Sequence, residues 1–395
     1  MSKNIVNAID IRSDKIICLV AQELEIVNKG KILQLIGMGV SKLPVDCSDP
    51  YDLGLGMLSK YVKDAIEIAE NESLIKIKNA YVSISDAFYS KYIQYQVDIK
   101  KEKIQDFHIK NFFKTEEFKN LYTIDREPLH SFPISYRINN SKSVSDPINL
   151  QADFLNIKWH NIVAEKRYIR RVNHILLELN IAVKQIVINN YASSLSILDE
   201  MEADLGAITI DIGKSRTFLS FMLDNQLIDF DVLSLGTYNF SKDLSQILSI
   251  SLQEANLIRK RMDKFESIDI VERKDVDFYK IYQSRAEELV DLISYKLRQS
   301  KYYSLVDKNI IFTGYGSKSL LISKTIKSKF NLSNCRLGSA RKINGNRLVV
   351  DNPSYSSSFG LLAYAVNHEF EQNESNKIIE KDSIFSNIYN FFKAI

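Results

Sequence analysis

The chain has 395 residues, of which 45% are hydrophobic and 26% charged, a composition typical of folded proteins long enough for two or more domains. Its 52 basic and 49 acidic residues leave a net charge of +3, which gives no reason to expect a nucleic-acid partner. Cys18, Cys47 and Cys335 form no C-x-x-C pair, which argues against a disulfide framework and a zinc site. The sequence contains neither a signal peptide nor a membrane-spanning apolar run, so the cytoplasm is the expected compartment.

The first half of the chain has the pattern of an α/β domain. It is expected to form strands at residues 5–11, 15–21 and 32–40, a helix at 50–70 and a strand at 80–85. The first two strands meet at a turn formed by Asp10, Ile11 and Arg12. Three strands, a helix and a further strand in this order are typical of a sheet with a helix packed on it.

Residues 88–165 differ from their surroundings and are interpreted as a small α/β insert. Lysines alternate with aromatic residues near its middle, a pattern that fits either stacking on nucleic acid or an amphipathic helix. Acidic Glu116 and Glu117 lie among these lysines, which favours the helix. The apolar residues expected to be partly buried in it are Ile109, Phe112, Phe113 and Phe118.

The order of the first half is repeated after residue 206. A hairpin with the sequence AITIDIGKSRTFLSF spans residues 207–221 and turns at Asp211, Ile212 and Gly213. A third strand at 227–233 and a helix at 241–252 follow it. Two such units predict a duplicated domain, and a ligand held between the halves would face both turns.

The last part of the chain contains a glycine turn, a polar spacer and an apolar end. A strand at 309–313 leads into Gly314-Tyr315-Gly316 and then a helix at 320–330, an arrangement that directs backbone N–H groups toward a ligand. Residues 369–382 are polar and charged, which is typical of a flexible linker. Residues 383–395 have the spacing of an amphipathic helix.

This terminal helix could pack on its own domain or lie in a membrane surface. The polar spacer before it and its four aromatic residues favour the membrane. The residues expected to enter the lipid are Ile384, Phe385, Ile388, Phe391, Phe392 and Ile395. Because the helix contains a single basic residue, Lys393, we expect weak binding to anionic lipid that self-assembly would strengthen by avidity.

In this order the motifs resemble those of the FtsA family of bacterial cell-division proteins, which belongs to the actin-like ATPase superfamily. Ala8-Ile9-Asp10-Ile11 with Ser13 and Lys15 resembles the first phosphate hairpin of that family. Residues 207–213 with Thr217 resemble the second. Ser234-Leu235-Gly236 resembles the stretch that follows, Thr313-Gly314 with Gly316 the adenosine motif, and Pro353-Ser354-Tyr355 with Gly360-Leu361-Leu362 the closing motif.

The resemblance implies two actin-like, ribonuclease H-like α/β domains with a nucleotide cleft between them and an FtsA-type inserted subdomain. The implied ranges are 1–86 and 165–190 for the first domain, 87–164 for the insert, 191–235 and 305–368 for the second domain, 236–304 for its subdomain, 369–382 for the linker and 383–395 for the membrane helix. It also implies ATP and Mg²⁺ as cofactors. The implied nucleotide-binding residues are Asp10, Arg12, Ser13, Lys15, Asp211, Gly213, Lys214, Thr217, Gly236, Gly314 and Gly316, with Asp10 and Asp211 holding Mg²⁺ through water.

Several positions depart from the family pattern. Arg12 and Tyr315 stand where the family prefers glycine, and Lys214, Ser215 and Arg216 replace a glycine-rich run. Side chains at such turns either contact phosphate in place of backbone N–H groups or crowd it out, and the sequence leaves both possibilities open. No catalytic residue can be nominated, so at most weak ATPase activity is expected.

The resemblance implies a non-enzymatic adaptor that binds ATP, forms filaments and ties FtsZ to the cytoplasmic face of the inner membrane at the division septum. Arg285 and Glu288 match an R-x-x-E pattern that in the family contacts the C-terminal peptide of FtsZ. The alternatives are an actin-like scaffold for pilus assembly and a small-molecule kinase of the same superfamily. The insert and the tail argue against both.

Overall fold

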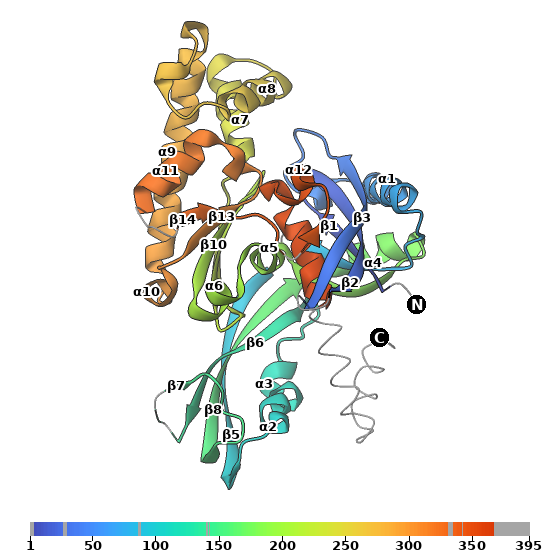
Figure 1. Cartoon of the computed structure of the whole chain (residues 1–395), viewed down its shortest axis with the longest axis vertical. Coiled ribbons are helices and arrows are strands. Elements are labelled where there is room, and N and C mark those ends of the chain that lie inside the picture. The colour runs from blue at the N-terminus through green and yellow to red at the C-terminus, as the bar shows by residue number, and fades with distance from the viewer. Residues whose placement is uncertain are drawn as a thin grey trace.

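The computed structural model describes residues 4–26, 30–85, 88–139, 141, 143–330, 335–341 and 343–366. These form two α/β domains side by side, an elongated insert below them and a small helical subdomain above (Figure 1). The predicted linker at 369–382, the predicted helix at 383–395 and its six proposed lipid-contacting residues lie outside the described residues. Among the helices that are described, none is both long enough and apolar enough to span a bilayer.

The first domain is built on a sheet in the order β15-β3-β2-β1-β4-β9. Its strands are β1 (Ile5–Ile11), β2 (Lys15–Ile26), β3 (Gly30–Lys42), β4 (Asn79–Ile84), β9 (Ala182–Ile188) and β15 (Ile343–Asn344). Helices α1 (Leu55–Ser73) and α4 (Lys166–Glu178) cover one face, where Ile9 and Ile11 are buried. The alternation of side chains along β1 turns Val6 and Ala8 to the opposite face.

The second domain repeats this plan with the order β12-β11-β10-β13-β14. Its strands are β10 (Ala207–Ile212), β11 (Thr217–Leu223), β12 (Gln226–Leu233), β13 (Ile310–Thr313) and β14 (Cys335–Leu337), and helices α9 (Val276–Gln299) and α11 (Leu320–Phe330) cover its outer face. In both domains the first strand pairs antiparallel with the second and parallel with the next core strand. Asp10 is thereby paired with Ser83, and Asp211 with Thr313. This equivalence confirms the predicted duplication.

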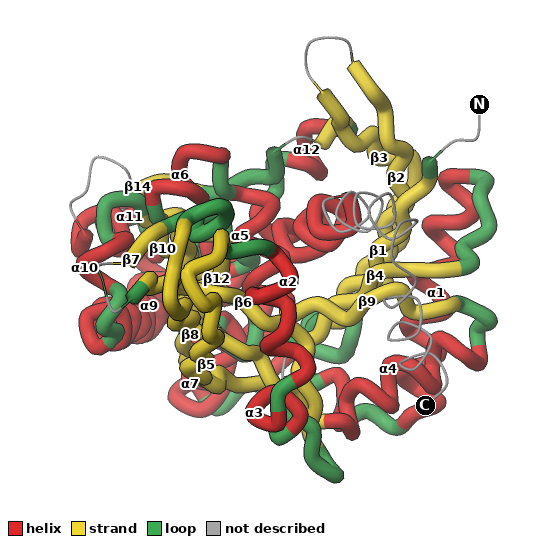
Figure 2. The backbone as a smooth tube through the Cα atoms, turned by 90° about the horizontal axis from the view of Figure 1, so that it is seen from below, coloured by secondary structure: helices red, strands yellow, loops and turns green. Residues whose placement is uncertain are grey.

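One apolar cluster joins the two domains. It contains residues of both sheets together with α5 (Asn189–Ile197) and the helical residues 356–366, which lie between the sheets. Gly360 allows these two helices to cross closely, because a Cβ atom there would lie 1.7 Å from the carbonyl oxygen of Ala192. Seen from below, the two domains lie on opposite sides of these helices (Figure 2).

The insert is a sheet in the order β5-β8-β6-β7, with strands β5 (Phe88–Lys103), β6 (Arg126–Ile138), β7 (Ser143–Val144) and β8 (Gln151–Glu165). Its middle forms three short helices rather than the single one expected: α2 (Asp106–Lys110), η2 (Asn111–Lys114) and α3 (Glu116–Lys119). Thr115 interrupts them in an extended conformation and caps α3. Ile109, Phe112 and Phe118 are buried as predicted, whereas Phe113 is exposed. Phe112 stacks on Trp159 with ring centroids 4.4 Å apart.

The helical subdomain contains α7 (Thr237–Leu248), α8 (Leu252–Met262), η3 (Ile268–Ile270), η4 (Arg273–Asp275) and the beginning of α9. The remaining elements are η1 (Pro50–Asp52), α6 (Glu200–Leu205), α10 (Tyr303–Val306), η5 (Gly316–Lys318), α12 (Arg347–Val350) and η6 (Pro353–Tyr355). The helical spacing of residues 191–201 predicts a single helix, but the structure has two, α5 and α6, because Leu198 is extended and Asp199 forms a capping box with Glu202 at the start of α6.

Candidate functional site

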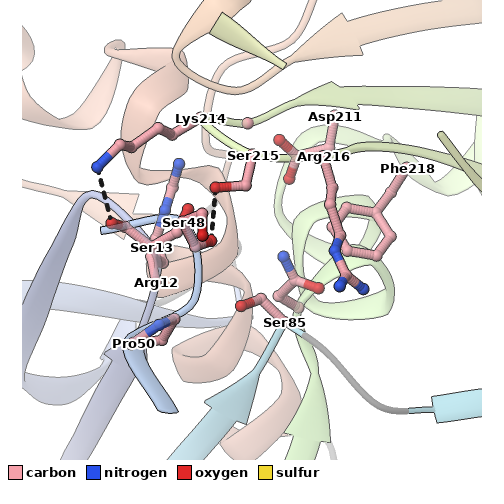
Figure 3. Close-up of a pocket in the computed structure, with 12 residues that line it drawn as sticks. Arg12, Ser13, Ser48, Pro50, Ser85, Asp211, Lys214, Ser215, Arg216 and Phe218 are labelled. Atoms are coloured by element: carbon pink, nitrogen blue, oxygen red, sulfur yellow. Dashed lines mark hydrogen bonds between the residues drawn. The ribbon is translucent and has the colours of Figure 1, made fainter. Parts of the chain in front are cut away.

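The two hairpin turns lie at the ends of β1 and β10, where they line the same pocket between the domains (Figure 3). Arg12 and Ser13 enter it from the first domain, and Asp211, Gly213 and Lys214 from the second. The structure therefore brings the two predicted turns together. The side chains that fill the space between them decide what the pocket can hold.

Asp10 is completely buried, and both of its carboxylate oxygens already accept hydrogen bonds from the chain. Ser83 donates to Oδ1. Ser357 and Ser358 donate to Oδ2 at 2.6 and 2.7 Å. These serines belong to β4 and to the helix at 356–366, so Asp10 ties together elements that are distant in sequence.

Arg12 extends from the first turn into the centre of this cluster and is 6% exposed. Its NH1 group donates to the carbonyl oxygen of Ser354 at 2.8 Å, and its Nε lies 3.2 Å from Asp14. Burial alone would lower the pKa of the Arg12 guanidinium, but the nearby charges of Asp14, Asp10 and Asp211 raise it. Arg12 is therefore a permanent cation held among three carboxylates.

The partner turn presents Asp211, which is 5% exposed. Ser193 of α5 donates to its Oδ2 at 2.5 Å. Burial raises the pKa of Asp211, and the charge of Arg12 opposes that rise. Gly314 lies directly against this carboxylate with φ of +85°, and a Cβ atom at that position would be 2.3 Å from Asp211 Oδ1. Glycine is therefore required here for both conformation and space.

Lys214 and Ser215 reach across from the second domain to the first (Figure 3). Lys214 Nζ donates to the carbonyl oxygens of Ser13 and Pro44 at 3.2 and 3.0 Å. Ser215 Oγ donates to the carbonyl oxygen of Ser48 at 2.6 Å. Gly236 packs under this turn, since a Cβ atom there would lie 2.4 Å from the Lys214 carbonyl oxygen.

Two other predicted residues are engaged within their own domain. The Thr217 hydroxyl is fully buried and donates to the carbonyl oxygen of Leu235 at 2.8 Å. Lys15 lies 3.7 Å from Asp14 and 4.3 Å from the centre of the Tyr355 ring. Burial lowers the pKa of Lys15 to about 8, against the opposing charge of Asp14.

Tyr315 lies in the glycine turn between Gly314 and Gly316 in a right-handed conformation that any residue can adopt. The guanidinium of Arg259 stacks on its ring at 5.1 Å and donates to its hydroxyl at 3.3 Å. Arg259 is itself buried in an ion pair of 2.7 Å with Asp263, which also accepts from Tyr282 at 2.6 Å. This network connects α8 and α9 to the glycine turn.

Sequence reasoning missed most of the partners in the pocket. Asp14 lies in the first turn beside Arg12 but was not singled out. Ser83, Ser193 and Arg259 carry no local motif, and strand pairing and helix packing bring them to their partners. The hydroxyl-rich run at residues 354–358, SYSSS, could have indicated some of these partners, because closely spaced hydroxyls can donate hydrogen bonds to a carboxylate.

The free volume that these side chains leave is about 30 Å³. That is the volume of roughly one water molecule, whereas small-molecule sites span about 300–1,000 Å³. Asn189 lines the cavity, and its Oδ1 is buried with no hydrogen-bond partner in the described part of the chain, which suits a water. In the described ranges no group of three or more His, Cys, Asp or Glu side chains could hold a metal ion. In this arrangement the residues do not fit Mg²⁺ and ATP between the turns.

The residues predicted to bind a partner lie on α9, outside this pocket. Arg285 makes a two-pronged ion pair with Asp243 of α7, at 2.5 Å from Nε and 2.8 Å from NH2. Its NH1 group pairs with Glu288, one helical turn further on. The Arg285 side chain is one-quarter exposed and that of Glu288 about half exposed. Both are therefore accessible at the surface.

Solved structures with a similar architecture identify the fold. One is a "PilM-PilN type IV pilus biogenesis complex", matched over 91% of this chain and 98% of that chain at 12% identity with a TM-score of 0.61. Another is the ethanolamine utilization protein EutJ from Carboxydothermus hydrogenoformans, at 9% identity with a TM-score of 0.50 over 92% and 91% of the two chains. At such low identity the likeness concerns the fold alone. With its duplicated sheets and facing turns, the chain has an actin-like fold.

Comparison of sequences gives matches to FtsA proteins. A family model described as "SHS2 domain inserted in FTSA" matches residues 88–163, which form the insert. The cell division protein FtsA of Rhizobium meliloti (strain 1021) is 23% identical over 91% of this chain and 87% of its own length. FtsA of Buchnera aphidicola subsp. Schizaphis graminum (strain Sg) is 25% identical over 100% and 99%, and that of Borreliella burgdorferi 23% over 99% of both. Over nearly its whole length the chain is similar to FtsA proteins, and its insert matches the family model of the FtsA insert.

Proposed function

We propose that this chain acts in bacterial cell division as a scaffold that connects FtsZ to the cytoplasmic face of the inner membrane. The observation that supports this proposal is the match to FtsA proteins over nearly the whole chain together with the insert typical of that family. A pilus scaffold has only the low-identity fold likeness in its favour, and nothing specific favours a kinase.

The proposed contact with FtsZ is on the helical subdomain, at Arg285 and Glu288. Asp243 holds the Arg285 guanidinium in a fixed orientation on a partly exposed surface. A carboxylate of an incoming peptide would compete with Asp243 and Glu288 for the same donors. Arginine suits this exchange, since its planar group bonds two oxygens at once.

The test is the affinity of a fluorescent FtsZ C-terminal peptide measured by anisotropy. Arg285→Ala should weaken binding by about 10- to 100-fold, the range expected for a lost hydrogen bond to a charged group. Lys280→Ala is the matched control, because Lys280 is an exposed cation on the same helix, and it should bind as wild type does. Equal affinity of the wild type and the Arg285→Ala variant for the peptide would contradict the proposed contact at Arg285 on α9.

The terminal segment is proposed as the membrane anchor, with the six apolar residues named above in the lipid surface. Filament formation would then add avidity to a weak individual helix. We also propose that the protein acts through these contacts rather than by catalysis.

A further inference from the structure

We propose that this chain closes its interdomain cleft with its own side chains, so that the closed state needs no nucleotide. Arg12 occupies the position that a metal-bound phosphate would take. Tyr315 and Arg259 occupy the space beside the glycine turn. This inference concerns the cleft alone. It does not depend on the proposed contacts with FtsZ or lipid.

The first argument is the charge balance at the turns. Three carboxylates, those of Asp10, Asp14 and Asp211, act on the Arg12 guanidinium. Arg12 and two further cations, Lys15 and Lys214, act together on Asp14 and lower its pKa against the effect of burial. A buried carboxylate cluster normally needs a bound cation, and here the chain supplies one.

Second, the carboxylates of Asp10 and Asp211 both already accept hydrogen bonds from serine hydroxyls of the chain. Mg²⁺ requires oxygen ligands in near-octahedral geometry and usually keeps several waters. Asp10 has no exposed surface, and three serine hydroxyls occupy its two oxygens. Asp211 is engaged by Ser193 and enclosed by Gly314. Water-mediated coordination by this pair would require these hydroxyls and Arg12 to move.

The third argument is that direct bonds cross the cleft. Lys214 and Ser215 bind three carbonyl oxygens of the opposite domain, at Ser13, Pro44 and Ser48. Bonds of this kind hold the two turns at contact distance. In a cleft that a ligand closes, the ligand would make the corresponding contacts to both sides.

The fourth argument comes from the glycine turn. Gly314 keeps the left-handed conformation of a tight turn, but the next residue is tyrosine. The Tyr315 ring and the Arg259 guanidinium are stacked, and Asp263 and Tyr282 fix the guanidinium from behind. The surface between the turn and α8 is therefore occupied by a bonded pair of side chains.

The test compares full-length wild type with an Arg12→Gly/Tyr315→Gly variant, which carries the smaller residues that the family prefers. Thermal unfolding is followed without nucleotide, with ATP and Mg²⁺, and with ATP and EDTA. Wild type should unfold at the same temperature in all three. The variant should gain a saturable rise in unfolding temperature that requires both ATP and Mg²⁺.

Two results with wild type would overturn the proposal. One is a saturable stabilisation by ATP with Mg²⁺ that Asp211→Ala abolishes. The other is stabilisation by ATP in EDTA that Arg12→Gly abolishes, which would make Arg12 a phosphate ligand. A double variant that folds but gains no nucleotide binding would also contradict the proposal, because Arg12 and Tyr315 would then not be what keeps nucleotide out of the cleft.

Hydrogen exchange of wild type keeps the proposal testable if the double variant does not fold. The backbone amides of Gly213, Thr237 and Gly314 donate within the turns at 2.9 to 3.2 Å. They should be strongly protected without nucleotide, and ATP with Mg²⁺ should leave their exchange rates unchanged. Fast exchange that slows on adding ATP with Mg²⁺ would show a ligand-closed cleft instead.

Discussion

At the scale of single residues, Arg12 is the side chain on which the cleft depends most. It is buried and donates a hydrogen bond to the carbonyl oxygen of Ser354, while its positive charge interacts with Asp10, Asp14 and Asp211. A glycine at this position would remove the cation that acts on all three carboxylates. The sequence position alone could not distinguish a phosphate contact from an internal ion pair, because Ser354 is 342 residues away along the chain.

Arg12→Ala should therefore destabilise the protein by about 3–5 kcal/mol, the usual effect of removing one partner from a buried ion pair. The measurement is the free energy of unfolding from urea titration at neutral pH. Arg347→Ala is the control, since the Arg347 side chain is 81% exposed, and it should change the free energy by less than about 0.5 kcal/mol. A loss below about 1 kcal/mol for Arg12→Ala would show that the carboxylates do not need this cation.

At the scale of elements, the insert is fixed to the second domain through β5, β8 and β12. His160 of β8 is fully buried, donates from Nδ1 to the Leu227 carbonyl oxygen at 2.7 Å and lies 2.8 Å from Ser90 Oγ through Nε2. Tyr92 of β5 donates to Asp229 of β12 at 2.6 Å. The histidine is therefore part of the joint that orients the insert.

This joint should weaken in mild acid. Burial lowers the pKa of His160 to about 4, although its bond to Leu227 opposes the shift, while the unfolded chain has the ordinary value near 6.5. As pH falls from 6.5 to 4 the unfolded state binds a proton that the folded state does not, so stability is lost. The stability advantage of wild type over His160→Gln should shrink by up to about 3 kcal/mol across this window.

The measurement is urea unfolding of both proteins at several pH values between 4 and 7. Tyr92→Phe is the matched control, because it loosens the same joint and retains the histidine, so its pH dependence should follow that of wild type. If the difference in free energy of unfolding between wild type and His160→Gln were the same at all pH values, His160 would not be the cause of the acid sensitivity.

The elements also show what sequence patterns can establish. Period-two strands and helical stripes predicted most strands of both sheets, the duplicated order and the helix at Leu320–Phe330, because burial on one face imposes those periods directly. The short edge strands β14 and β15 were not predicted. The break at Leu198 and the three short helices of the insert were missed. They depend on the caps formed by Asp199 and Thr115, which the spacing of apolar residues does not reveal. The site was predicted as a pair of turns, but the partners that hold its side chains come from β4, α5, α8 and residues 354–358.

At the scale of the whole molecule, two actin-like domains share one core around α5 and residues 356–366, and the cleft above that core is closed by side chains. The functions proposed here are assigned to α9 and to the terminal segment rather than to the cleft. A scaffold of this kind would connect its two partners without a nucleotide-dependent step.

Removing residues Ile384–Ile395 tests the membrane end of this scaffold. The truncated protein should no longer co-sediment with vesicles that contain anionic lipid, because the apolar face that enters the lipid surface is lost. Full-length protein with Phe385 and Phe392 both changed to Ser is a second variant and should behave in the same way. Unchanged co-sedimentation of either protein would contradict the anchor.

The most direct test of the scaffold is the recruitment of a fluorescent FtsZ C-terminal peptide to anionic vesicles in the presence of EDTA and without nucleotide. The full-length protein should bring the peptide to the vesicles, and Arg285→Ala and the truncation before Ile384 should each abolish recruitment. Peptide that remains in solution with the wild-type protein, while the protein itself is on the vesicles, would contradict the proposed scaffold.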